Sequence, residues 1–236
     1  MKYFDEAYYR LCQHASFDSA LEADEQACGA DETYFQRLWV QKQTEYLSML
    51  SLPADSEEGK ALFRAQVEAY AAQLQEELPE RILKNVADVR VLAMNRAAPA
   101  VKKQIEKYCE SNRRAAQRIE RAYEKYYQKA CADFALDMVS QIGFHDCLIS
   151  EIVTQLGDLF FAFPAAQTHS YITAMRCVKC QKIKEDGLVA GAVWLYEEIY
   201  KAGDQYELQV LVQLPDGRIS DFIIRAQRFE FRGAIT

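Results

Sequence analysis

The chain has 236 residues and a formal net charge of −7 at neutral pH, and half of its residues are hydrophobic. This composition predicts a folded protein of one large or two small domains, and it excludes an intrinsically disordered chain. The acidic balance argues against a general nucleic-acid-binding surface, because such surfaces carry a basic face or stripe.

The first residues, MKYFDEAYYRLC, lack the basic and continuous apolar segments of a secretory signal peptide. No apolar run approaches the roughly 18 residues of a membrane span. The seven cysteines stand at irregular spacings, which is typical of reduced thiols in a reducing compartment. We therefore expect a cytoplasmic protein without membrane contact.

Residues 1–140 place apolar side chains at helical spacing. Asp31 is expected to cap the first clear helix, which ends before the loop LPADSEEG. The next segment has an apolar stripe that predicts a second helix: Phe63, Val67, Tyr70 and Leu74. Pro79 suits the first turn of a third helix, with the stripe Ile82, Val86, Val89 and Ala93.

The longest helical signal covers residues 99–140, with no Gly or Pro after Pro99. Such a helix is either the spine of an antiparallel helical array or it breaks once near Asn112. Its arginines alternate with glutamates at three- and four-residue spacing, which is typical of a solvated, ion-paired helix face; they are Arg113, Arg114, Arg118 and Arg121. The alternative is a surface for nucleic acid or an acidic partner, and the acidic balance disfavours nucleic acid.

After Gly143 the apolar period changes to two, as in YELQVLVQL, whose residues Tyr206, Leu208, Val210 and Val212 share one face. We expect strands at 145–154, 159–163, 169–181, 192–200, 205–214 and 218–231. The sequence thus predicts an α+β protein: a helical region, 1–140, and a largely meandering antiparallel sheet, 142–236, docked on the long helix. An isolated 142–236 fragment is expected to aggregate or be molten.

His145, Asp146 and Cys147 are three reactive side-chain types in consecutive positions. On a strand, His145 and Cys147 lie on one face and Asp146 on the other, so the three do not converge. A His-Asp metal site of the phosphohydrolase kind needs more histidines than the three in this chain. We predict instead that Asp146 anchors the start of the strand by accepting hydrogen bonds from backbone N–H groups.

Cys177 and Cys180 form one CxxC pattern, whereas a structural zinc site needs four ligands. With His145 and Cys147 they are the candidate residues of the alternative interpretation, a metal-binding or enzymatic protein. A strand would point Cys177 and Cys180 to opposite sides, so we predict no bound zinc, no other cofactor and no catalytic residue.

Trp194, Tyr196 and Tyr200 are expected to share one face of a strand. Such an aromatic face is either core under a helix or an anchor for a protein partner, so these three are the candidate partner-binding residues. The adjacent Glu197 and Glu198 would point to opposite faces, which argues against a paired acid and base.

Three phrases, MKYF, FHDC and WLYEEIY followed by YELQVLVQL, resemble a family of uncharacterised bacterial proteins, mainly Gram-positive, catalogued as a domain of unknown function. The resemblance covers nearly the whole chain and implies no activity, cofactor or catalytic residue. The His-Asp strand opening is also similar to one in small β-rich bacterial proteins grouped with toxin-immunity proteins, which implies a binding role.

The leading interpretation is a non-catalytic cytoplasmic protein that binds a macromolecular partner, as an immunity-like or regulatory factor. A protein partner is favoured over nucleic acid. The sequence indicates neither the partner nor the oligomeric state.

Overall fold

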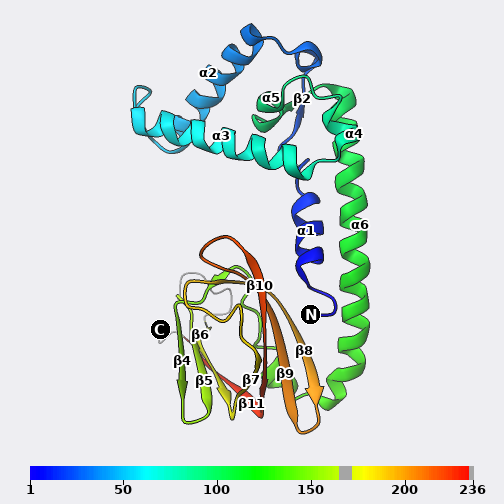
Figure 1. Cartoon of the computed structure of the whole chain (residues 1–236), viewed down its shortest axis with the longest axis vertical. Helices are drawn as coiled ribbons and strands as arrows, with labels where there is room; N and C mark the ends of the chain where they lie inside the picture. Colours follow the sequence, from blue (N-terminus) through cyan, green and yellow to red (C-terminus); the bar gives the residue numbers. More distant parts are fainter. Residues whose placement is uncertain (165–171, 234–236) are drawn as a thin grey trace. The chain divides into compact units, whose positions relative to one another are not determined.

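The structure is a computed structural model of the chain and describes residues 1–164 and 172–233 (Figure 1). The chain forms two compact units. The sheet unit consists of Met1–Arg10 and Ala115–Thr236, and the helical unit consists of Leu11–Arg114. Secondary structure changes from helix to strand near residue 142, whereas the division between the units falls within two helices, α1 (Glu6–His14) and α6 (Pro99–Ala130).

The helical unit takes its shape from capped, amphipathic helices. Asp31 caps α2 as expected, because its Oδ1 accepts a hydrogen bond from the N–H of Tyr34 at 2.8 Å. Ser56 caps α3 in the same way. Besides α1 and the first part of α6, this unit contains β1 (Glu22–Ala23), a 3₁₀ turn (Glu25–Gly29), α2 (Glu32–Met49), α3 (Glu57–Glu77), α4 (Glu80–Leu83), α5 (Val89–Ala93) and β2 (Arg96–Ala97).

The expected third helix is two short helices, α4 and α5. Asp88 separates them, because its Oδ1 accepts a hydrogen bond from the N–H of Arg90 at 2.8 Å and so starts a new helix. A side-chain cap in the middle of the stripe offers the backbone an alternative to a continuous helix. The apolar stripe still enters the core, where Ile82 and Ala93 are buried.

The long helix α6 has 32 residues and runs through Asn112 without a break. It ends at Ala130, before the expected residue 140, in a 3₁₀ turn (Cys131–Asp133) and the short α7 (Leu136–Val139). This turn allows Phe134 and Met138 to join the core between the sheets, where both are buried. The burial of these two side chains accounts for the earlier end of the helix.

The C-terminal strands form two antiparallel sheets, where one had been expected. The five-stranded sheet has the order β3-β8-β9-β10-β7, with β3 (Cys147–Leu148), β7 (Gln181–Lys184), β8 (Val193–Ala202), β9 (Gln205–Gln213) and β10 (Ile219–Ala226). The four-stranded sheet has the order β11-β6-β5-β4, with β4 (Glu151–Gln155), β5 (Asp158–Ala162), β6 (Ile172–Val178) and β11 (Arg228–Gly233). Most pairings are sequential hairpins, so the protein is α+β as the sequence predicts.

Two expected strands are each divided between the sheets. The segment 145–154 becomes β3 and β4, and the segment 218–231 becomes β10 and β11. Each of these segments begins in one sheet and continues in the other. One stretch of strand-forming residues therefore contributes to both layers around the core. Residues 169–171 of another expected strand lie outside the described residues.

The two sheets pack face to face around one core. Phe161 of the four-stranded sheet lies 5.8 Å from Phe222 of the five-stranded sheet, measured between ring centroids. Leu208, Val210 and Val212 are fully buried in this core. The apolar face of β9 therefore packs against the second sheet and not against the long helix, which corrects the sequence-based expectation. None of the helices in the described part of the chain is long and apolar enough to cross a membrane.

Candidate functional site

A bulge in β8 decides which side chains of this strand meet. Trp194 pairs with Val212 and Tyr196 pairs with Leu211, so Leu195 is an extra residue. Past the bulge, Glu197 lies opposite Val210 and therefore on the same core-facing side as Trp194. The expectation that Trp194 shares a face with Tyr196 and Tyr200 is wrong for this reason.

Glu197 lies at the margin of the sandwich core. Trp194 Nε1 donates a hydrogen bond to Glu197 Oε2 at 2.7 Å. Burial raises the pKa of the Glu197 carboxyl, and the Trp194 hydrogen bond and the nearby His145 act in the opposite direction. A carboxyl with a raised pKa holds its proton to higher pH than an exposed one.

Glu198 is fully buried on the opposite face of β8 and holds the start of the chain. Its carboxylate accepts hydrogen bonds from the N–H groups of Lys2 at 3.0 Å, Tyr3 at 2.7 Å and Phe4 at 2.6 Å. The hydroxyl of Tyr200 donates to the same carboxylate. Four donors explain how a carboxylate is accommodated without exposure to water.

The aromatic residues on this face of β8 are covered within the sheet unit. The Tyr196 ring lies 5.0 Å from Tyr8, and the Tyr200 ring lies 5.1 Å from Tyr126 of α6. Both side chains are half-buried, whereas Trp194 is fully buried between the sheets. The assignment of these three residues to a protein partner stays a prediction.

The structure places His145, Asp146 and Cys147 in three different surroundings. Cys147 is fully buried, and His145 and Asp146 are exposed. His145 Nδ1 donates to the carbonyl oxygen of Leu195, and its Nε2 lies 3.5 Å from an Asp146 carboxylate oxygen. The ring of His145 lies 4.9 Å from that of Tyr196.

The predicted anchoring role of the Asp146 side chain is wrong. Its carboxylate is 70% exposed and has no hydrogen bond to a backbone N–H among the described residues. The backbone carries the structural role, because the N–H of Asp146 donates to the carbonyl of Trp194 at 2.8 Å and its φ is +61°. Asp and Asn tolerate this left-handed conformation better than most residues.

Cys177 lies within β6, and Cys180 follows the turn at the end of this strand. Cys177 is fully buried in the core, and burial raises its pKa well above the usual range of a thiol. Burial also raises the pKa of Cys180 to about 11. High pKa values keep both thiols protonated and weakly nucleophilic at neutral pH. Across residues 1–164 and 172–233, no three His, Cys, Asp or Glu side chains are grouped so as to hold a metal ion.

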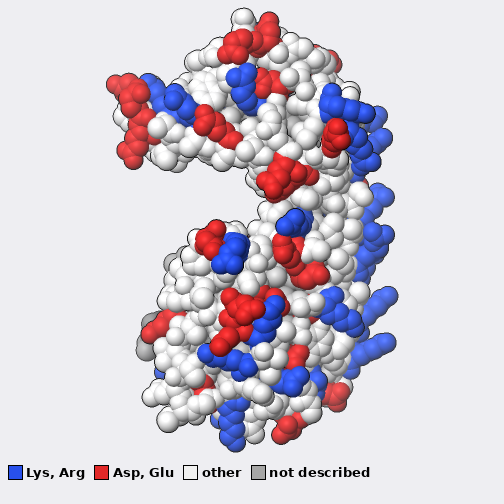
Figure 2. All heavy atoms as spheres, viewed as in Figure 1, with Lys and Arg blue, Asp and Glu red and all other residues white. Residues whose placement is uncertain are grey.

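The second part of α6, within the sheet unit, carries a row of exposed cations that we call the basic face. It consists of Arg118, Arg121, Lys125 and Lys129, whose spacing of three and four residues aligns them on one side of the helix. Figure 2 shows blue side chains following this helix. Within the described chain, none of the four has an ion-pair or hydrogen-bond partner.

The glutamates between these cations are engaged elsewhere. Glu120 accepts a hydrogen bond from the hydroxyl of Tyr8 at 2.9 Å, and Glu124 accepts one from Gln128 at 2.7 Å. The expected ion-paired helix face is therefore wrong for Arg118 and Arg121. The sequence indicates this for two of the four cations, because Arg118 and Lys125 have no acidic residue three or four positions away.

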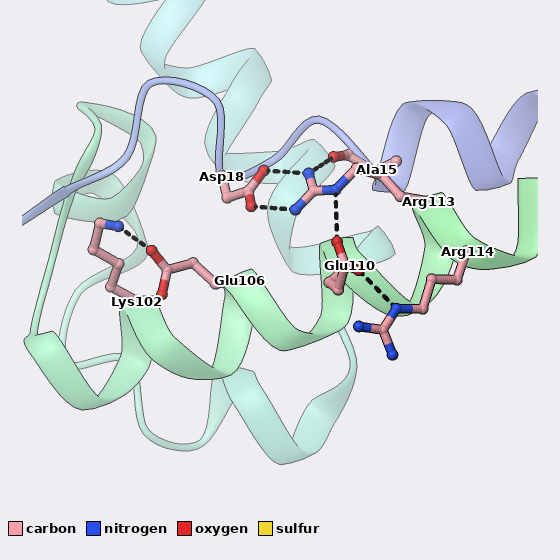
Figure 3. Close-up of polar contacts among 7 residues, drawn as sticks. All are labelled: Ala15, Asp18, Lys102, Glu106, Glu110, Arg113 and Arg114. Atoms are coloured by element: carbon pink, nitrogen blue, oxygen red, sulfur yellow. Dashed lines mark hydrogen bonds and ion pairs between the residues drawn. The ribbon is translucent and has the colours of Figure 1, made fainter. Parts of the chain in front are cut away.

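The part of α6 in the helical unit has the opposite character (Figure 3). Arg113 binds Asp18 through two parallel contacts of 3.0 and 2.9 Å and donates to the carbonyl of Ala15 at 2.7 Å. Arg114 pairs with Glu110 at 2.7 Å. Hydrogen bonds from Arg113 lower the pKa of Asp18. The expected ion pairing is confirmed for these two arginines, in contrast to Arg118 and Arg121 of the basic face.

The comparisons with known proteins concern most of the chain. A family model described as "Protein of unknown function (DUF4085)" matches residues 40–224. No curated protein and no solved structure matches the chain.

Proposed function

Because the chain belongs to the DUF4085 family of proteins of unknown function, we propose its function from the site itself: it is a non-catalytic binding protein whose basic face contacts an acidic segment of a protein partner. The observation that carries the proposal is the row of four exposed cations without a partner in the described chain. Such a surface suits a regulatory or immunity-like protein that recognises an acidic partner. Seven unpaired cysteines support a cytoplasmic location.

In the free protein, repulsion among the cations of the basic face destabilises helix α6. Arg121 and Lys125 are four residues apart, and so are Lys125 and Lys129. Like charges at this spacing destabilise a helix by roughly 0.2–0.5 kcal/mol per pair. An anionic segment lying along the face removes this repulsion, so binding would stabilise the helix as well as the complex.

The chemistry of the face favours an acidic peptide segment over a hydrophobic interface. None of the large hydrophobic side chains that are strongly exposed in the described chain lies on α6. Without an apolar anchor, attraction depends on charge and weakens as salt screens it. The whole chain has 35 acidic and 28 basic residues, so a long polyanion that extends beyond the face would meet repulsion. A short acidic segment is therefore favoured over duplex nucleic acid.

The test neutralises the face by changing Arg118, Arg121, Lys125 and Lys129 together to Gln, which keeps helix propensity. The matched control changes four ion-paired cations to Gln and so removes the same charge: Arg10, Lys182, Arg218 and Arg228. Fluorescence anisotropy measures binding of labelled polyglutamate and of a short DNA duplex at low salt. We expect polyglutamate binding to weaken about tenfold or more in the face variant and to change little in the control.

Two outcomes would contradict the proposal. Equal loss in both variants would show that net charge, and not the face, attracts the peptide. Tighter binding of the duplex than of polyglutamate, lost in the face variant, would replace the protein partner with nucleic acid.

A further inference from the structure

The four sheet edges differ in how they are protected against pairing with another strand. The edge strand β3 has only two residues, β7 carries Lys182 and Lys184, and β11 carries Arg228 and Arg232. Short length and exposed cations are the usual ways of blocking an edge. The remaining edge, β4, has the sequence EIVTQ with no Pro, Lys or Arg, and it pairs with β5 in unbroken register.

The backbone groups of β4 can be assigned to its two sides. The N–H of Phe163 donates to the carbonyl of Thr173, so the odd-numbered residues of β5 direct their backbone groups toward β6. The even-numbered residues, such as Phe160, then face β4 and bond to their partners, such as Val153. Ile152 and Thr154 therefore direct their N–H and carbonyl groups away from β5, to the free edge, where no strand of residues 1–164 or 172–233 pairs with β4.

A groove on the outer face of the four-stranded sheet starts at this edge. Its volume is about 370 Å³, and its lining includes Glu151 and Val153 of β4, Phe160 and Ala162 of β5, and Ala174 of β6. Val153 is 40% exposed, and Leu156 in the turn that follows is 97% exposed. An added strand gains main-chain hydrogen bonds from an edge and selectivity from such a groove.

The free charge of the groove is negative at β4, whereas the unpaired cation of its lining, Arg232, lies on β11 at the opposite edge of the described sheet. Arg176 is occupied, because it donates to Asp158 at 2.8 Å and to Glu230 at 3.0 Å. Glu151 is exposed and has no ion-pair partner among the described residues. A cation on an incoming strand would find its complement at Glu151.

We propose that β4 is the docking edge for an extended segment of a protein partner, which adds a strand beside β4 and places a basic side chain at Glu151 and an apolar side chain at Val153. The proposal concerns a different surface from the basic face and does not depend on it. It assigns a second binding surface, for a ligand of the opposite charge, to the same unit.

The probes are two capped peptides with threonine on one face of the strand and alternating residues on the other. One peptide alternates valine with lysine, and the matched peptide replaces each lysine with glutamate. We expect the full chain to bind the lysine peptide about threefold to tenfold more tightly than the glutamate peptide. Glu151→Lys should reverse this preference, and the edge control Lys182→Gln on β7 should leave it unchanged.

Thr154→Pro tests the strand pairing itself. Proline removes an N–H that points to the free edge and leaves the bonds to β5 in place, so the variant should stay folded and lose binding of both peptides. Circular dichroism checks the fold. Unchanged binding in Thr154→Pro, or no preference between the peptides, overturns the proposal. A dimer of the wild-type chain in sedimentation, dissociated by Thr154→Pro, would overturn it in favour of a second copy at this edge.

Discussion

At the scale of single residues, the protonation of Glu197 is coupled to folding. Its pKa is raised by burial, so the folded protein holds the proton more firmly than the unfolded chain does. The stability that this group contributes is full below its unfolded pKa and is lost as the pH rises through the folded pKa. Ionisation of Glu197 therefore costs the folded protein more than it costs the unfolded chain.

We expect Glu197→Gln to raise the unfolding midpoint at neutral pH, because Gln has no charge to bury and its Oε1 can still accept the Trp194 hydrogen bond. The advantage should shrink toward acid pH, where the wild-type carboxyl is protonated. Thermal melts across a pH series measure this difference. The same stabilisation at every pH would show that charge burial is not its cause.

Asp146 matters through its backbone conformation. Its φ of +61° costs a residue with an ordinary side chain about 1 kcal/mol, whereas glycine adopts it freely. We expect Asp146→Ala to lower the free energy of unfolding by about 1 kcal/mol and Asp146→Gly to be nearly neutral. Denaturant unfolding of both variants measures this. If Gly destabilises as much as Ala, the carboxylate itself has the anchoring role that the sequence suggested.

At the scale of elements, sequence patterns located most helices and strands but not their ends. The cap at Asp31 was predicted correctly, because a cap depends on local residues. The end of α6 at Ala130 could not be predicted from local residues, because it depends on the burial of Phe134 and Met138 in a core built by distant strands. Burial by tertiary contacts overrides a local helical pattern.

The candidate sites also divide into features that depend on local residues and features that depend on tertiary contacts. The basic face could be found from the spacing of its cations and glutamates, since these contacts act along one helix. The contact between Trp194 and Glu197 could not be predicted from the sequence, because the bulge at Leu195 shifts every later side chain of β8 to the other face. The role of Glu198 was also unreadable, because its donors lie almost 200 positions away in the chain.

At the scale of the whole molecule, the sheet unit depends on residues outside its strands. A fragment of residues 142–236 keeps most of the core between the sheets but loses Phe134 and Met138 from it, and it also lacks the second part of α6 and the first ten residues. Glu198 would then lose its three backbone donors, and the N–H of Ile199 would lose the hydroxyl of Tyr123. Each lost hydrogen bond contributes about 0.5–1.5 kcal/mol, and the face of β8 that these residues cover becomes exposed to water, so we expect this fragment to be molten or to aggregate.

Near-UV circular dichroism and size-exclusion chromatography test the fragment. A longer fragment, 115–236, restores Tyr123 and is the control, which should melt more cooperatively. Equal, cooperative melting of both fragments would show that the two packed sheets need neither the second part of α6 nor the first ten residues.

The hydrogen bonds from Lys2, Tyr3 and Phe4 to Glu198 also set an order of events during synthesis. These three residues are made before their acceptor, which follows almost 200 positions later in the chain. The intervening segment, Leu11–Arg114, already contains its own core by then and can fold first. A folded helical unit shortens the loop that must close, so we expect the docking of residues 2–4 on Glu198 to be a late step of folding.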